Sequence, residues 1–307
     1  MNKILIGMMM TTLLAFQVKA EDNKATWLVD IGDAVSLTAH ICTLKNDASM
    51  KDIARIDNKL HKFMDDNDIR GMRQILAPLF ATGTSYDYIA FDFMTWAQFG
   101  KNWDLALKTK VGNGLMADYA EVEDCDAMIA SVFPLMRKES NFQLTSSISV
   151  VEWCTRMPGV SQQQLGEKHR TVAAETKDST TATWWGVGYP AGGLRDGLFP
   201  GDFFHLVSYP DMNAFAASRN DIANNGGWKM RSDYYTSYAD CSGEHILAAE
   251  RVRRRSYADD RKSYRHHKKG LAAENVASPF SVQLTSLVIS LHLPLTLANV
   301  PIFRRPQ

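Results

Sequence analysis

Two histidines and one arginine of this chain are the side chains best suited to acid–base chemistry. His40 and His205 each lie in a β-rich run, and Arg156 ends a third such run. A histidine can exchange a proton near neutral pH, and an arginine beside it can hold a developing oxyanion. We therefore name His40, His205 and Arg156 as candidate catalytic residues.

Carboxylates and aromatic side chains in the same runs could bind a ligand beside these histidines. A carboxylate in a semi-enclosed site would have a shifted pKa, and tryptophans could line an apolar wall. The alternatives are internal salt bridges, a solvated strand and ordinary core packing. The candidate ligand-binding residues are Asp92, Glu121, Glu152, Tyr119, Tyr235, Trp153 and Trp184.

Side-chain alternation assigns these residues to the faces of strands. In the run "SLTAHICTL", Leu37 and Ile41 share one face, while His40 and Cys42 share the other. We expect the apolar face to meet helices, which leaves His40 facing a cavity between two sheets. A shift of one residue would invert this assignment.

The cysteines carry a second kind of chemistry. The chain has four of them, and no C-x-x-C, H-E-x-x-H, G-x-S-x-G, P-loop or EF-hand pattern occurs. An even number of cysteines in an exported chain favours disulfides over a metal site. We therefore expect no metal site.

The spacing of the cysteines reveals two similar halves. The stretches "YAEVEDCDAM" and "YTSYADCSGE" both place a tyrosine six residues before a cysteine, at an offset of 116. Near the start of each half, Cys42 aligns with Cys154 at an offset of 112. We interpret residues 34–135 and 147–250 as tandem repeats.

Each repeat predicts the element order β-α-β-β-α-β, with the quoted stretches as last strands and Ser49 or Ser161 capping the first helix. This order is that of the ferredoxin-like unit, an α+β fold whose first and last strands are antiparallel neighbours. Disulfides Cys42–Cys125 and Cys154–Cys241 are then predicted. Bridges between the repeats and free thiols are the alternatives.

The distribution of charge limits which partners the chain is expected to bind. The net charge is zero, but residues 251–307 hold 11 Lys/Arg and 3 Asp/Glu. The remaining body is therefore acidic, which argues against nucleic acid as a partner.

The two ends of the chain differ from the body. Residues 1–20 carry an early lysine, a short apolar run and a small residue before Glu21, which predicts a cleaved signal peptide and an exported, periplasmic or extracellular protein. A retained membrane anchor is the alternative. The basic and then apolar residues 251–307 could be disordered, a membrane anchor or the product of a shifted reading frame. We expect no stable membrane insertion.

Two fused β-α-β-β-α-β repeats resemble the dimeric α/β-barrel superfamily, in which two ferredoxin-like sheets face each other and enclose a cavity. The superfamily includes cofactor-free monooxygenases, lactone isomerases, polyketide cyclases, haem peroxidases and chlorite-degrading haem enzymes. The resemblance implies a pseudo-dimeric barrel here, and fold alone does not choose a reaction.

Our leading hypothesis is a monomeric or weakly associated protein that binds a small, partly apolar molecule in the cavity between the repeats, without a cofactor. One alternative is a cofactor-free monooxygenase or isomerase with His40 or His205 as base and Arg156 as oxyanion holder. The other is a haem-binding oxidoreductase with His40 or His205 as axial ligand.

Overall fold

The structure is a computed structural model that describes residues 33–81, 85–138, 140, 144–193, 201–241 and 243–255. The expected signal peptide, residues 1–20, lies outside these residues. Residues 256–307, which make up most of the expected tail (251–307), also lie outside them.

The first half of the described chain forms four strands and three helices. Asp52 accepts hydrogen bonds from the amide and hydroxyl of Ser49, which begins the first helix as predicted. The antiparallel strand order is β4-β1-β3-β2. The elements are β1 (Val35–Leu44), α1 (Met50–Asp66), β2 (Gly71–Phe80), β3 (Tyr88–Met94), α2 (Trp96–Lys108), α3 (Lys110–Val122) and β4 (Glu123–Arg137).

The second half follows the same order of elements, with its last strand divided in two. Ser161 begins the first helix and accepts a hydrogen bond from the Gln164 amide. Strands β8 and β9 both pair with β5, at opposite ends of it. The elements are β5 (Ser146–Arg156), α4 (Gln162–Thr176), β6 (Trp184–Gly192), β7 (Phe203–Tyr209), α5 (Met212–Asn224), α6 (Gly227–Ser237), β8 (Ala239–Cys241) and β9 (His245–Arg255).

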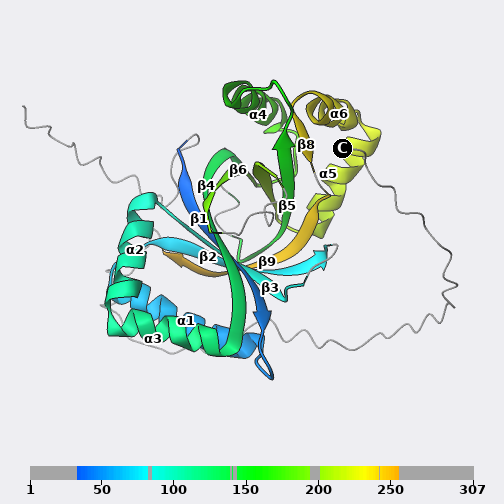
Figure 1. Ribbon diagram of the computed structural model, residues 1–307. Coiled ribbons are helices and arrows are strands. Elements are labelled where there is room, and N and C mark those ends of the chain that lie inside the picture. Colours follow the sequence, from blue (N-terminus) through cyan, green and yellow to red (C-terminus); the bar gives the residue numbers. More distant parts are fainter. Residues whose placement is uncertain are drawn as a thin grey trace, which may run out of the picture. The chain divides into compact units, whose positions relative to one another are not determined.

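The two halves join edge to edge. Strand β4 pairs with β6 and β2 pairs with β9, so that β1–β7 and β9 close an eight-stranded antiparallel barrel. Helices α1–α3 lie on one side of the barrel and α4–α6 on the other (Figure 1). An α+β barrel of this kind is the architecture of the dimeric α/β-barrel superfamily, and the predicted resemblance is confirmed at the level of fold.

Both predicted disulfides are present. Cys42 lies directly opposite Cys125 on β1 and β4, and Cys154 lies opposite Cys241 on β5 and β8. The described residues contain no free cysteine.

The barrel interior is an apolar core, and this corrects the predicted faces of the strands. Leu37 and Ala39 of β1 pack in one buried cluster with Phe204 and Leu206 of β7. His40 and Cys42, which lie on the other face of β1, therefore face the helices instead. The apolar residues turn inward because the barrel interior is enclosed on every side.

Three predicted strand residues lie on helices. Tyr119 and Glu121 belong to α3, and Tyr235 belongs to α6, so the strands begin later than predicted. In α3, Leu115, Tyr119 and Val122 recur at three- and four-residue steps and pack in one cluster, a helical period. Strand β9 also runs past the predicted end of the second repeat, residue 250, to Arg255.

Candidate functional site

The predicted site residues do not meet in one cavity between the repeats. His40 and Asp92 lie under the helices of the first half, whereas His205 and Glu152 lie under those of the second. Trp184 and Trp153 belong to the barrel core. Glu121 is exposed on α3, outside both helix-covered layers.

In the first half, the polar residues form a closed network around a buried arginine. Arg73 Nε lies 2.9 Å from Asp57 Oδ1, and its Nη1 lies 2.6 Å from Asp92 Oδ2. The hydroxyl of Tyr119 donates to Asp57 at 2.5 Å, and His40 Nε2 lies 3.8 Å from Asp92.

The electrostatics of this network suit a structural role. Burial opposes the charge of Arg73, but the carboxylates of Asp92 and Asp57 more than offset it and raise the arginine pKa. Burial lowers the pKa of His40 despite the nearby Asp92 carboxylate. The arginine and both carboxylates already have partners, so this cluster stabilises the packing of α1 and α3 on the sheet.

In the second half, the corresponding layer contains a pocket of about 540 Å³. It lies between the outer face of the sheet and helices α4, α5 and α6. Its apolar wall includes Val150, Val207, Val172, Ile222 and Met230. This volume is typical of sites for small organic molecules.

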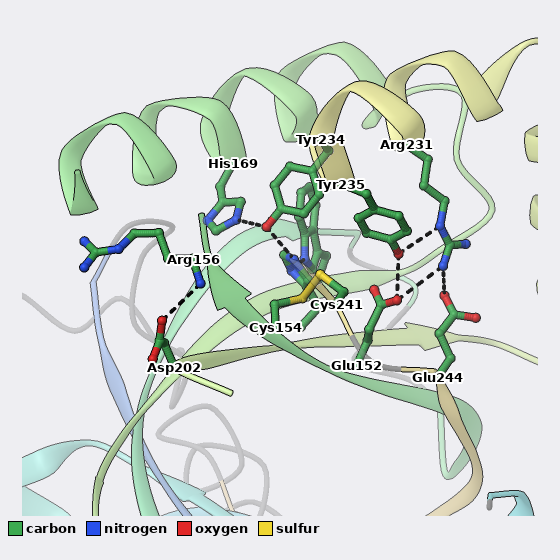
Figure 2. The surroundings of a disulfide bond; sticks show 12 residues. Glu152, Cys154, Arg156, His169, Asp202, Arg231, Tyr234, Tyr235, Cys241 and Glu244 are labelled. Carbon is green, nitrogen blue, oxygen red and sulfur yellow. Dashed lines mark hydrogen bonds and ion pairs between the residues drawn. A yellow bond between two sulfur atoms is a disulfide. The ribbon is translucent and has the colours of Figure 1, made fainter. Parts of the chain in front are cut away.

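One wall of the pocket carries a chain of uncharged hydrogen-bonding groups. The indole Nε1–H of Trp185 donates to His205 Nδ1 at 3.1 Å. The Tyr234 hydroxyl lies 3.0 Å from His205 Nε2 and 2.7 Å from His169 Nε2 (Figure 2). Burial lowers the pKa of both histidines, that of His169 to about 4, so both are neutral at pH 7.

Trp185 fixes which group donates and which accepts at each step of this series of hydrogen bonds. An indole nitrogen can only donate, so His205 Nδ1 is the acceptor and its Nε2 carries the proton. His205 Nε2–H then donates to the Tyr234 oxygen, and the Tyr234 hydroxyl donates to His169 Nε2. Every group in the chain thus has a defined role.

The other end of the pocket is charged. Glu152 Oε1 accepts from the Tyr235 hydroxyl at 2.6 Å and lies 3.3 Å from Arg231 Nη2. Arg231 also contacts Glu244 at 2.9 Å, and Glu244 pairs with Arg219 at 2.9 Å. Figure 2 shows Glu152, Tyr235, Arg231 and Glu244 in this arrangement. Burial raises the pKa of Glu152. The hydrogen bond from Tyr235 and the positive charge of Arg231 lower this pKa and so reduce the shift.

Arg156 does not line this pocket, and several residues that do line it were not expected from the sequence. Arg156 lies beyond the disulfide, where its backbone amide donates to Asp202, and its side chain points away from Tyr234 and Tyr235 (Figure 2). Arg231 occupies the charged end instead. A helical reading of residues 227–237 would have found it, because Arg231, Tyr234 and Tyr235 then share one face.

His169 of α4 is a lining residue that the sequence did not single out as a site residue. It is only 2% exposed and faces the sheet between α4 and α6.

A haem iron bound by His205 does not fit these residues. Both ring nitrogens of His205 are engaged, by Trp185 and by Tyr234, so neither has a free lone pair for iron. His40 lies in the other half of the molecule, beside Asp92. Cys154 and Cys241 lie near His205, but their sulfurs are joined to each other.

No family model and no curated protein matches the chain. Among solved structures, it is similar to an anthrone oxidase-like protein, with 10% identity and a TM-score of 0.45 over 73% of this chain and 94% of that one. A haem-binding protein from Thermus thermophilus shares 9% identity, with a TM-score of 0.41 over 78% and 98%. A variant of chlorite dismutase from Candidatus Nitrospira defluvii shares 8%, with a TM-score of 0.42 over 73% and 93%.

None of the helices in the described residues is both long and apolar enough to cross a membrane.

Proposed function

We propose that this protein binds a small, partly apolar molecule in the pocket between the sheet and helices α4–α6. The observation that carries the proposal is the pocket itself, about 540 Å³ with an apolar wall and polar groups held in fixed orientations. Binding of this kind was expected between the repeats, but apolar side chains pack the barrel interior.

An acid–base reaction in this pocket would rely on a carboxylate rather than a histidine. His205 and His169 both use Nε2 within the chain of hydrogen bonds through Tyr234. Glu152 is a buried lining carboxylate whose pKa is raised by burial, and a carboxylate of this kind can act as an acid or a base. The monooxygenase or isomerase alternative therefore depends on Glu152.

Export and duplication belong to the same proposal. Two disulfides are compatible with an oxidising compartment, which supports the signal peptide expected at residues 1–20. The recurrence of the element order and of the disulfide positions supports a tandem duplication in which the second repeat specialised for binding.

The test of binding is a comparison of two neighbouring substitutions on α5. Ala216 and Ala217 are both exposed, but only Ala217 lines the pocket. The protein, produced in a bacterial periplasm, is examined by native mass spectrometry and titrated with the neutral dye Nile red. Ala217→Trp should abolish retained mass and dye binding, and Ala216→Trp should change neither. A wild-type protein with no retained mass and no dye binding would refute the proposal.

A further inference from the structure

The carboxylate of Glu152 is only half engaged. Its Oε1 accepts from Tyr235 and lies near Arg231, while among the described residues no hydrogen bond reaches its Oε2. Glu152 is 8% exposed and lines the pocket. Glu152 Oε2 is therefore an open acceptor at the pocket, where a donor on a ligand could bind it.

The formal charges around the pocket favour a positive ligand. Its described lining includes four carboxylates, those of Glu152, Glu175, Asp221 and Glu244, but the guanidinium groups of only two arginines. The lining histidines are neutral, so the carboxylates are in excess. An ammonium group in such a site is attracted, and a carboxylate is repelled.

Both lining arginines already pair with the carboxylate of Glu244, which disfavours an anion further, although Arg219 Nε has no hydrogen-bond partner in the described part of the chain. Arg231 contacts Tyr235, Glu152 and Glu244. Arg219 pairs with the other oxygen of Glu244. An anionic ligand that displaced Glu152 or Glu244 from Arg231 would leave that carboxylate without this cation.

From these contacts we propose that the ligand class is a protonated amine with an aromatic or otherwise apolar body. Its ammonium group donates to Glu152 Oε2, and its body lies against Val150, Val207 and Met230. The proposal rests on the proposed binding function and adds the chemistry of the ligand. The rings of Tyr234 and Tyr235 also line the pocket, and such rings attract cations.

Three probes that share one bicyclic body test the proposal: naphthylmethylamine, naphthylmethanol and naphthoate, titrated calorimetrically into the full wild-type protein. We expect the amine to bind on the order of 10-fold more tightly than the alcohol, and naphthoate to bind most weakly. Glu152→Gln should remove most of the preference for the amine. Asp178→Asn, an exposed change outside the pocket lining, should not.

The outcomes separate the ligand class from the binding function. Naphthoate binding as tightly as the amine would overturn the ligand class, even if Glu152→Gln failed to fold. So would binding of Nile red without binding of any naphthyl probe. If the naphthyl probes and Nile red all fail to bind, the proposed function itself fails.

Discussion

At the residue scale, two arginines bind carboxylates in different surroundings. Arg73 has a side chain that is 5% exposed and compensates two carboxylates, those of Asp57 and Asp92. The side chain of Arg231 is 30% exposed at the pocket, where Glu244 keeps a second cation in Arg219. The same substitution should therefore have different effects in the two halves.

Arg73→Met should lower the free energy of unfolding by about 3–5 kcal/mol, because it leaves buried carboxylates without a cation. Arg231→Met should cost about 1 kcal/mol and impair ligand retention instead, since water reaches its site. Urea unfolding of both variants, with native mass spectrometry of the second, measures this contrast. Equal losses of stability would show that the Arg231 network is as well shielded from water as the Arg73 network.

The buried His169 should make stability depend on pH. Its pKa is about 4 in the folded protein, against about 6.5 in the unfolded chain. Between these values the unfolded state binds more protons, so the free energy of unfolding falls as the pH falls. The loss from His169 should reach about 2 kcal/mol near pH 4.5, and His205 acts in the same direction.

His169→Gln is the matched control for this pH effect. A glutamine oxygen can accept from Tyr234 but does not titrate, so the variant should have a flatter slope of unfolding free energy against pH. An unchanged slope would exclude His169 as its source.

The sequence identified several residues of the pocket but not their location. His205, Glu152 and Tyr235 are all lining residues. They were expected to face a cavity between the sheets, but they lie between the sheet and the helices. Both faces of each sheet are covered, one by the opposite side of the barrel and one by helices. Alternation then shows which residues share a face, but not which face is which.

At the scale of elements, helix α6 controls the charged and neutral ends of the pocket together. It supplies Arg231, Tyr234 and Tyr235 and leads into β8, which has only three residues. Beyond α6, β8 pairs with β5 only from Cys154 to Arg156, beside the disulfide. In the first half, β4 follows α3 and pairs with β1 from Val35 to Leu44. The two disulfides therefore support different lengths of strand pairing.

Removal of each disulfide should distinguish these situations. Both double alanine variants lose a bridge that closes more than 80 residues, about 4 kcal/mol by the chain-entropy model. Only the variant without Cys154 and Cys241 should also show faster amide hydrogen exchange in α6. The variant without Cys42 and Cys125 should keep slow exchange in α3, because the long β1–β4 ladder remains. Equally fast exchange in both helices would contradict this.

The helix starts and the second helix of each half were predictable, but the third helices, α3 and α6, were not. Ser49 and Ser161 precede helical residues with a capping partner three positions later, which is a local signal. The ends of α3 and α6, which contain Tyr119 and Tyr235, alternate in polarity and favour strands locally. Their packing against α1 and α4 decides for helix, and a local pattern does not contain that packing.

At the scale of the whole molecule, the barrel depends on pairings between the halves. Strand β2 pairs with β9, and β4 pairs with β6. The duplication predicted two sheets, but their edge-to-edge joining is set by contacts between residues more than 45 positions apart. The basic residues after 250 gave no strand signal, because the arginines of β9 resemble a polar tail.

The end of β9 gives the last prediction. Arg253 is 7% exposed, donates to the carbonyl oxygens of His61 and Ile69, and pairs with Asp65 of α1 at 2.9 Å. It thus connects the last strand of the described residues, β9, to their first helix, α1. A chain that ends at Glu250 lacks this residue and the pairing of β9 with Gly71–Gln74.

We therefore expect a chain that ends at Glu250 to be less stable than one that ends at Arg255, by at least about 2 kcal/mol. Arg253→Met in the full chain should reproduce much of that loss, since it leaves the two carbonyl oxygens without their donor. Urea unfolding of the three proteins measures these differences. Equal stability of the two truncated chains would mean that the barrel closes without the end of β9. A loss on truncation that Arg253→Met fails to reproduce would assign the stabilisation to the backbone pairing of β2 with β9 rather than to this side chain.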